Sequence, residues 1–306
     1  MSKNRKSRTG KKRTEKKLRK VLRDNLRHQY LTGQGMKRKG LKDIHNRTPY
    51  IHSDSTYKTY VKQVERFVKW CQEKGYKHLT KDIDYFVAEY IEDMQKDGLA
   101  PHTQAVALCA IAKALNRSTT SFDVELDKRN RDDYTRSRGI KERDKHFSEE
   151  NNIELVTICR CFGFRNNKEL QEVRASDFYK KKGELYCHVK GKGGKLREAK
   201  AYYDTNEERL IVEEYLIKHP KGKLFPPSKV HTAADVHDYR AQYAGRVYNH
   251  FARDTRTLPR SERYHKRTGE VFDKKALGEA SKALGHGKHR YTDMVNSYSR
   301  YCKQFE

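Results

Sequence analysis

The chain has 306 residues and a formal net charge of +27, and 36% of its residues are charged against 35% hydrophobic. This length allows two domains that each bury a core, and so large a positive charge indicates a polyanionic partner, most commonly nucleic acid. No apolar run approaches the roughly 20 residues of a membrane-spanning helix, and no apolar stretch follows the basic N-terminal segment as in a secretory signal. We therefore expect a nucleic-acid-binding protein of the cytoplasm, associated with the nucleoid and not with a membrane.

The cysteines do not have the spacing of a metal site. Their positions give no CxxC pair and no matching pair of histidines. We expect reduced thiols, as in an intracellular protein, and no bound metal. The six cysteines are Cys71, Cys109, Cys159, Cys161, Cys187 and Cys302.

Residues 1–48 are rich in lysine and arginine. Leu18, Leu22 and Leu26 form a stripe at helical spacing, but the stripe is too narrow to anchor a helix that stands alone. We expect a largely disordered basic arm that becomes ordered on DNA. A solvated tail without a specific role is the alternative.

From Pro49 onward the sequence is amphipathic. Apolar residues at helical spacing predict helices within residues 53–75, 80–98, 101–115 and 121–138. Four short helices make a small helical domain, which we place at residues 49–135. Lys58, Lys62 and Lys69 give the first of these helices a basic outer side suited to DNA phosphates, although a solvated face would explain them equally well.

Residues 136–145 are polar and lack apolar periodicity, so we expect the domain linker there. In the second domain, at residues 146–306, two strands at Glu184–Lys190 and Leu196–Ala201 flank a glycine-rich turn and predict a hairpin. Helices are expected around residues 155–162, 170–173, 207–217, 236–251 and 274–284. This domain should therefore be mostly helical, with one small hairpin.

Several residues of the second domain are chemically suggestive, but each has an ordinary explanation. Arginines in a basic protein mostly contact phosphates or water, GKGG is an ordinary turn, and any one of 20 tyrosines is a weak candidate nucleophile. The His-x-x-Arg spacing occurs twice, since His250 and Arg253 also satisfy it. The residues are, in chain order, Arg165, Lys192, His237, Arg240, His286 and Tyr298.

In this order, behind a small helical domain, the set resembles the tyrosine recombinase (phage integrase) family over roughly residues 50–306. The segments GKGGK, HDYRAQYAGRVY and KALGHGK carry the resemblance. The long segment between HDYR and LGH is most similar to integrases of mobile elements. The resemblance implies a mainly α fold, in which a helical SAM-like core-binding domain precedes a mostly helical catalytic domain with a small β-hairpin, the two gripping duplex DNA from opposite sides.

The resemblance also implies how the scissile phosphate is held and attacked. Arg165 and Arg240 would clamp its non-bridging oxygens, where negative charge develops. His286 would hydrogen-bond one of these oxygens. Tyr298 would attack phosphorus and form a 3′-phosphotyrosyl link with a free 5′-hydroxyl.

Two further residues would move protons in the implied reaction. A tyrosine hydroxyl has a pKa near 10, so His237 would help to accept its proton during attack. Lys192, at the tip of the hairpin, would protonate the leaving 5′-oxygen. Because the covalent link conserves bond energy, we expect neither a cofactor nor a metal.

Two departures from the family pattern concern the same region. The family usually has an acid three residues after its first arginine, but that position is Lys168, and Glu169 reaches the site only if a one-residue bulge intervenes. The gap from His286 to the candidate nucleophile is slightly long, which leaves Tyr291 and Tyr301 as rivals. Tyr298 is preferred because NSYSR is most similar to the family context.

The resemblance implies duplex DNA as substrate and four protomers acting on two sites, with accessory DNA-bending or directionality proteins as further partners. One rival is a type IB topoisomerase, which shares this chemistry but relaxes supercoils without a partner site. The other is a non-catalytic DNA- or RNA-binding regulator derived from an integrase. The target sequence is not encoded in any motif.

Overall fold

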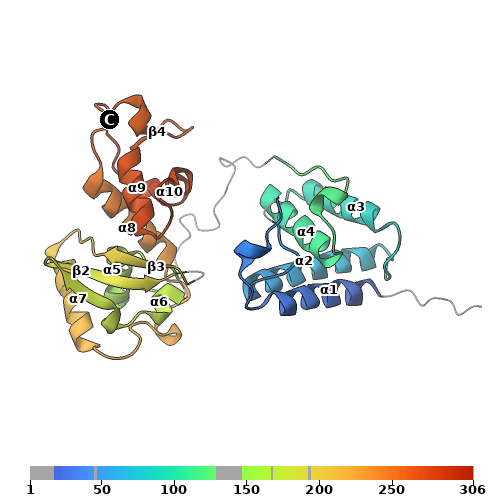
Figure 1. Ribbon diagram of the computed structural model, residues 1–306, viewed down its shortest axis with the longest axis horizontal. Helices are drawn as coiled ribbons and strands as arrows, with labels where there is room; N and C mark the ends of the chain where they lie inside the picture. Colours follow the sequence, from blue (N-terminus) through green and yellow to red (C-terminus); the bar gives the residue numbers. More distant parts are fainter. Residues whose placement is uncertain (1–16, 45–46, 129–146, 167, 192–193, 306) are drawn as a thin grey trace, which may run out of the picture. The chain divides into compact units, whose positions relative to one another are not determined.

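The structure is a computed structural model that describes residues 17–44, 47–128, 147–166, 168–191 and 194–305. The chain divides into two compact units, Met1–Arg136 and Ser137–Glu306 (Figure 1). The division falls at the start of the expected linker, residues 136–145, which itself lies outside the described residues. Within the described residues, no helix has the length and apolar character needed to span a bilayer.

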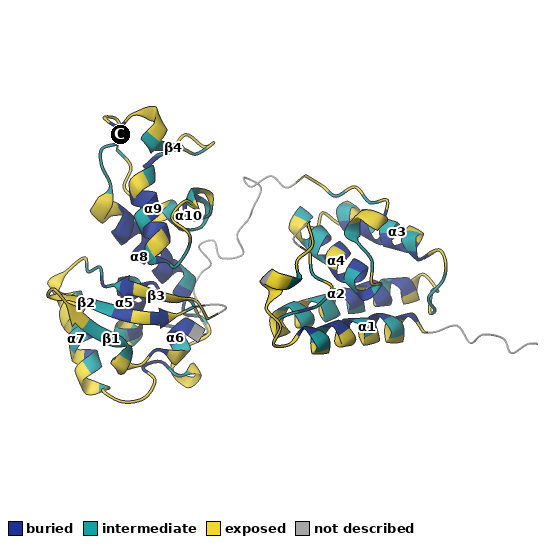
Figure 2. Ribbon diagram, in the orientation of Figure 1, coloured by how far each residue is buried: buried dark blue, intermediate teal, exposed yellow. Residues whose placement is uncertain are grey.

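In the part of the first unit that the structure describes, four α-helices pack around one core (Figure 2). Ser53 caps the second of them, because its side chain accepts a hydrogen bond from the Thr56 N–H at 3.3 Å. Pro101 opens the fourth, at the position where its missing N–H costs nothing. The four helices are α1 (Leu18–Gly33), α2 (Asp54–Glu73), α3 (Ile83–Lys96) and α4 (Pro101–Ala114).

Helix α1 corrects one expectation. A largely disordered arm over residues 1–48 is wrong for Leu18–Gly33, where Leu18, Leu22 and Leu26 are at most 2% exposed. The leucine stripe does not have to stabilise a helix alone, since it packs into the core that α2 and α4 share. Gln29 strengthens the contact by donating to the Lys113 carbonyl at 2.8 Å. Residues 1–16 lie outside the described residues.

The polar helix expected within residues 121–138 is absent from the described part of that range. A 3₁₀ turn at Thr119–Ser121 is followed by non-helical chain through residue 128. Its apolar residues, Phe122, Val124 and Leu126, alternate with polar ones and pack onto the core of the first unit. Alternation of this kind cannot present one helical face.

The described residues of the second unit form six α-helices and two small antiparallel sheets. Its helices are α5 (Ile153–Phe162), α6 (Lys168–Glu172), α7 (Asn206–Lys218), α8 (Val236–Phe251), α9 (Lys274–Ala283) and α10 (Tyr291–Tyr298). The strands are β1 (Phe178–Lys181), β2 (Glu184–Lys190) and β3 (Leu196–Lys200) in one sheet, and β4 (Arg263–His265) and β5 (Val271–Asp273) in the other. The expected β2–β3 hairpin is present, whereas β1 and the β4–β5 pair were not expected.

Helix α8 joins the two cores of this unit. Tyr239 belongs to the core formed with α5 and the three-stranded sheet, while Tyr243 and Tyr248 belong to the core formed with α9 and α10. A residue on α8 can therefore reach elements from both halves of the unit. The mainly α architecture with a small hairpin is confirmed.

Candidate active site

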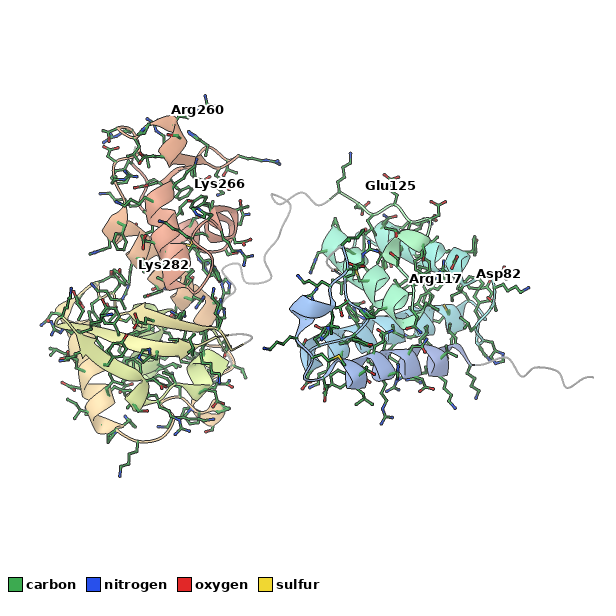
Figure 3. The ribbon with its side chains drawn as sticks, in the orientation of Figure 1. Asp82, Arg117, Glu125, Arg260, Lys266 and Lys282 are labelled. Carbon is green, nitrogen blue, oxygen red and sulfur yellow. The ribbon has the colours of Figure 1, made fainter. Side chains whose placement is uncertain are left out.

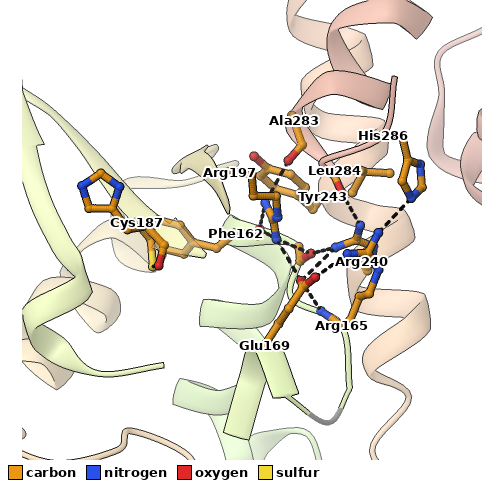
Figure 4. Close-up of polar contacts among 12 residues, drawn as sticks. Phe162, Arg165, Glu169, Cys187, Arg197, Arg240, Tyr243, Ala283, Leu284 and His286 are labelled. Atoms are coloured by element: carbon orange, nitrogen blue, oxygen red, sulfur yellow. Dashed lines mark hydrogen bonds and ion pairs between the residues drawn. The ribbon is translucent and has the colours of Figure 1, made fainter. Parts of the chain in front are cut away.

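A buried carboxylate, Glu169, binds three arginines from different elements of the second unit (Figure 4). Arg165 donates to it from the side chain and, at 3.0 Å, from the backbone N–H. Nη2 of Arg197 lies 3.3 Å and Nη1 of Arg240 3.5 Å from its Oε2. Burial acts to raise the pKa of Glu169, but the charges of Arg197 and Arg240 outweigh it and the pKa is lowered. Three guanidinium groups thus share one carboxylate, which leaves an excess of positive charge suited to an anion.

The turn between α5 and α6 brings Glu169 to this cluster. Gly163 ends α5 in the left-handed conformation with φ +60°, and a Cβ there would lie 2.3 Å from Cδ1 of Tyr243. The Leu170 N–H then donates to the Arg165 carbonyl at 3.2 Å, across five positions instead of the four of an α-helix. This wider turn accounts for the position of Glu169 beside the arginines.

Arg240 is almost completely buried, with 1% of its side chain exposed. It donates to the Gly163 carbonyl at the end of α5 and, at 2.6 Å, to the Leu284 carbonyl at the end of α9. Burial, followed by the charge of Arg197, lowers the pKa of Arg240 to about 10. The side chain therefore remains a cation at neutral pH and is held by the ends of both α5 and α9.

His286 lies directly after the turn that ends α9. Its Nε2 is 3.0 Å from Nη2 of Arg165, and since arginine can only donate, Nε2 accepts and the proton of the neutral ring is on Nδ1. Burial and the charges of Arg240 and Arg165 lower the pKa of His286 to about 4. At neutral pH the ring is thus an uncharged donor beside two guanidinium groups.

Three buried donors of this cluster have no acceptor among the described residues: Nε of Arg197, Nε of Arg240 and Nδ1 of His286. A buried donor without an acceptor is costly, and a site with several of them fits an anion that accepts from all. The cluster therefore has the charge and the donor groups to hold a phosphate.

Tyr298 lies beside the cluster at the end of α10 and is 8% exposed. Its ring stacks on His237 with centroids 5.3 Å apart, and the His286 ring is 6.1 Å away. The guanidinium carbon of Arg240 lies 5.9 Å from the centre of the tyrosine ring. Four of the sequence-predicted residues, Arg165, Arg240, His286 and Tyr298, are thus neighbours, with His237 against the tyrosine.

The two rival tyrosines are engaged elsewhere. The Tyr301 hydroxyl donates to the Asp238 carboxylate at 2.9 Å, and burial together with this hydrogen bond raises the pKa of Tyr301. The Tyr291 hydroxyl lies 3.0 Å from Nδ1 of His289. Neither contact involves the arginine cluster.

The remaining predicted residues belong to the first unit or lie outside the described residues. Lys192 lies outside them, in the gap between Gly191 and Gly194. Lys58, Lys62 and Lys69 are exposed on α2, and Lys69 pairs with Glu73 at 3.5 Å. Figure 3 shows further basic side chains at the surface. No group of three or more His, Cys, Asp or Glu residues is placed to hold a metal ion in the described part of the chain.

Sequence reasoning missed Arg197, which is 5% exposed and contacts Glu169. A signal was present. Arg197 pairs with the buried Val189 across the hairpin, and it lies two residues before the buried Ala199, so strand alternation turns it toward the core. An arginine on the core side of a strand needs a buried partner, which is a reason to search for one.

Residues 45–118 match the family described as phage integrase, N-terminal SAM-like domain. No curated protein matches the sequence. Among solved structures, the chain is similar to the XerH site-specific recombinase bound to a palindromic difH substrate in a post-cleavage complex, with 15% identity, a TM-score of 0.52 and 95% of each chain covered. A pre-cleavage complex of XerH with difH aligns with 15% identity, a TM-score of 0.49, and 95% of this chain and 98% of that chain covered. The chain therefore has the fold of the tyrosine recombinases, with an N-terminal domain of the phage integrase SAM-like type, as its sequence motifs predict.

Proposed function

We propose that the protein is a site-specific DNA recombinase that cleaves and rejoins strands through a 3′-phosphotyrosyl intermediate. The observation that carries the proposal is the position of Tyr298 beside a buried cluster in which three arginines share one carboxylate and three donors lack acceptors among the described residues. Such a cluster stabilises charge that develops on a phosphate during attack. The proposed biological role is integration or excision of a mobile element.

In the proposed reaction, the scissile phosphate accepts from Arg165, Arg240 and the Nδ1–H of His286. Glu169 holds both arginines, backbone carbonyls also hold Arg240, and Arg165 holds the His286 ring, so little reorganisation is needed when the phosphorus becomes pentacoordinate. The His286 ring is neutral, since its pKa is lowered to about 4, and it acts as a hydrogen-bond donor and not as a base.

Tyr298 is the proposed nucleophile. Its hydroxyl oxygen forms a bond to phosphorus while the bond to the 5′-oxygen breaks, and its proton passes toward His237, which stacks on its ring. Lys192 is the proposed donor of the proton that the leaving 5′-oxygen requires. Attack by a 5′-hydroxyl of another strand reverses these steps and releases the tyrosine.

DNA binding by the first unit is a second part of the proposal. The exposed Lys58, Lys62 and Lys69 lie on one helix of the SAM-like domain and fit phosphate contacts. The proposed active form is a tetramer on two paired sites, because a recombinase must hold four strands; accessory DNA-bending proteins would help to assemble it.

Nicked duplexes made from DNA that flanks the gene test the nucleophile. The wild type should form an SDS-resistant protein–DNA adduct, and Tyr298→Phe should lose it at least 10³-fold while binding the same DNA with nearly unchanged affinity. Tyr301→Phe and Tyr291→Phe are matched controls that should retain the adduct. An adduct from Tyr298→Phe would remove Tyr298 from the proposed reaction.

A plasmid assay separates recombination from simple relaxation. Relaxation of supercoiled plasmids without the flanking DNA would favour the topoisomerase alternative. Tight binding with no adduct from any variant would favour a non-catalytic regulator.

A further inference from the structure

Arg197 is the arginine of the cluster that no sequence motif identified, and its side chain joins two separate turns. Its Nη2 donates to the Gly163 carbonyl at 3.0 Å, and its guanidinium also contacts the Phe162 carbonyl at 3.3 Å. These carbonyls end α5 and precede Arg165. Its Nη1 donates to the Ala283 carbonyl at 2.8 Å, at the end of α9, three residues before His286.

The end of α9 is held by three cations in succession. The carbonyls of Ala283, Leu284 and Gly285 accept from Arg197, Arg240 and Lys195, respectively, the last two at 2.6 and 2.9 Å. Carbonyls in the last turn of a helix lack partners within the helix and attract cations. Since His286 follows directly, these three contacts fix the backbone from which its side chain extends.

Gly285 adds a steric element to this arrangement. It has φ +75°, and a Cβ there would lie 2.9 Å from Cδ of Arg197. The backbone turn that leads into His286 therefore packs against the aliphatic part of the Arg197 side chain, and it also accepts a hydrogen bond from the guanidinium group.

Arg197 also belongs to the strand that follows Lys192. It lies on β3, five residues beyond that lysine, and Lys195 of the same segment binds the Gly285 carbonyl. The pairing of β2 with β3 runs from Tyr186–Lys200 to Lys190–Leu196, and Arg197 pairs with Val189 close to the turn. A fixed Arg197 therefore fixes the end of the two strands that adjoins the turn.

We propose that Arg197 is a positioning residue that locks the turn-proximal end of strands β2 and β3 to the turns carrying Arg165 and His286. This inference rests on the proposed function. It assigns to Arg197 no contact with DNA: the residue acts through Glu169, the Gly163 carbonyl and the Ala283 carbonyl. Loss of Arg197 leaves Arg240 to join the end of α5 to the end of α9, and it leaves Glu169 with two arginines in place of three.

The first test compares Arg197→Met, Arg197→Lys and the matched control Arg246→Met in single-turnover cleavage of the nicked duplex. Arg246 is another arginine of the same unit with little exposure, 10%, and it binds Glu208 at 2.7 Å, away from the cluster. Misplacement of catalytic groups by about 1 Å costs on the order of 10²-fold in rate, and we expect that loss for Arg197→Met, with DNA affinity changed less than about threefold. Arg246→Met should unfold at lower temperature but cleave normally below its melting temperature.

The pH profile separates positioning from loss of stability. Among the charges that lower the pKa of Glu169, that of Arg197 has the largest effect. The other charged groups that face Glu169 are Arg240 and Arg165. In Arg197→Met the pKa of Glu169 should rise, so cleavage should fall at a higher pH on acidification than in the wild type. Arg197→Lys keeps the charge and should restore the wild-type acid limb, while its rate stays reduced because one ammonium cannot reach both turns.

A second readout does not depend on cleavage. Nitrogen-15 NMR of the free protein follows the titration of His286, whose pKa is lowered to about 4 in the wild type. In Arg197→Met the loosened turn should move this pKa toward the ordinary value by at least about one unit, with Arg246→Met unchanged. An unchanged His286 titration, or wild-type cleavage by folded Arg197→Met, would overturn the positioning role. Absence of any adduct from the wild type would instead reject the proposed recombinase reaction, and the NMR comparison would still decide the role of Arg197.

Discussion

The same His-x-x-Arg spacing occurs at the two ends of helix α8, but the balance of arginines and carboxylates around it differs. At the N-terminal end, Arg240 is buried and shares Glu169 with two other arginines. At the C-terminal end, Arg253 is 38% exposed and has two carboxylates of its own, Asp273 at 2.8 Å and Glu262 at 2.7 Å. The first arrangement has positive charge to spare, and the second has none.

The two histidines also differ in the aromatic rings that they contact. His237 stacks on Tyr298, whereas His250 packs between Tyr202 and Phe251, with ring centroids 5.3 and 4.8 Å away. Asp273, the partner of Arg253, also caps α9 by accepting from the Lys275 N–H at 2.8 Å. The C-terminal pair is thus part of the framework that holds α9. A sequence spacing becomes a candidate site only where buried cations outnumber their carboxylates.

Replacing the two arginines should give the largest contrast. Arg240→Ala should lower single-turnover cleavage about 10³-fold, because it removes a preorganised donor to the phosphate. Arg253→Ala should cleave at nearly the wild-type rate but lose about 1–3 kcal/mol of unfolding free energy, since Asp273 is fully buried and loses its partner. Cleavage assays and urea unfolding measure the two effects. A comparable loss of cleavage in folded Arg253→Ala would end the distinction between the two ends of α8.

Removing the carboxylate partners should sharpen the comparison. Glu169→Gln should slow cleavage about 10²-fold at pH 7, because the arginines lose the charge that positions them. The folded state lowers the pKa of Glu169, so its stabilising contribution is complete above the unfolded value near 4.3 and is lost as the pH falls through the folded value. Urea unfolding at pH 7 and pH 3.5 should therefore show a smaller acid loss in Glu169→Gln than in the wild type. Asp273→Asn is the control, and it should lose stability without this effect on cleavage.

The smallest expected effect is in the titration of His286, whose midpoint should lie below that of an ordinary histidine. Its pKa is lowered to about 4, below the unfolded value near 6.5, so the neutral ring favours folding above pH 6.5 and this contribution is lost as the pH falls toward 4. The ring should stay neutral from pH 5 to 8, and cleavage should show no step from this group in that range. Nitrogen-15 NMR measures the midpoint directly; a midpoint near 6.5 would mean that Arg165 does not donate to Nε2.

The sequence predicted those elements whose signals are local. Helices α2, α3 and α4 have apolar faces and clear ends, such as Ser53 before α2 and Gly75 after it, and they form where expected. Helix α1 was missed because the surface that covers its leucines is supplied by residues far along the chain. Strands β1, β4 and β5, of three or four residues, are too short to show a period.

The same limit applies to the candidate site. Motif order pointed to Arg165, Arg240 and His286, and the structure brings them into one hydrogen-bonded cluster. Arg197 could not be assigned a partner, because its contacts reach back to Gly163 and forward to Ala283, across 34 and 86 positions. Such contacts exist only once the two turns have been folded against the hairpin.

The close approach of Gly245 to the C-terminal segment has a consequence for sequence variation. A Cβ at Gly245 would lie 2.5 Å from Cβ of Tyr301, and Tyr301 follows Tyr298 by only three residues. The same Cβ would lie 2.8 Å from the Tyr301 carbonyl oxygen, so a smaller side chain at position 301 would not make room for it. Any side chain at position 245 should therefore displace the segment next to the tyrosine, and a library that randomises position 245 should return glycine among its active members.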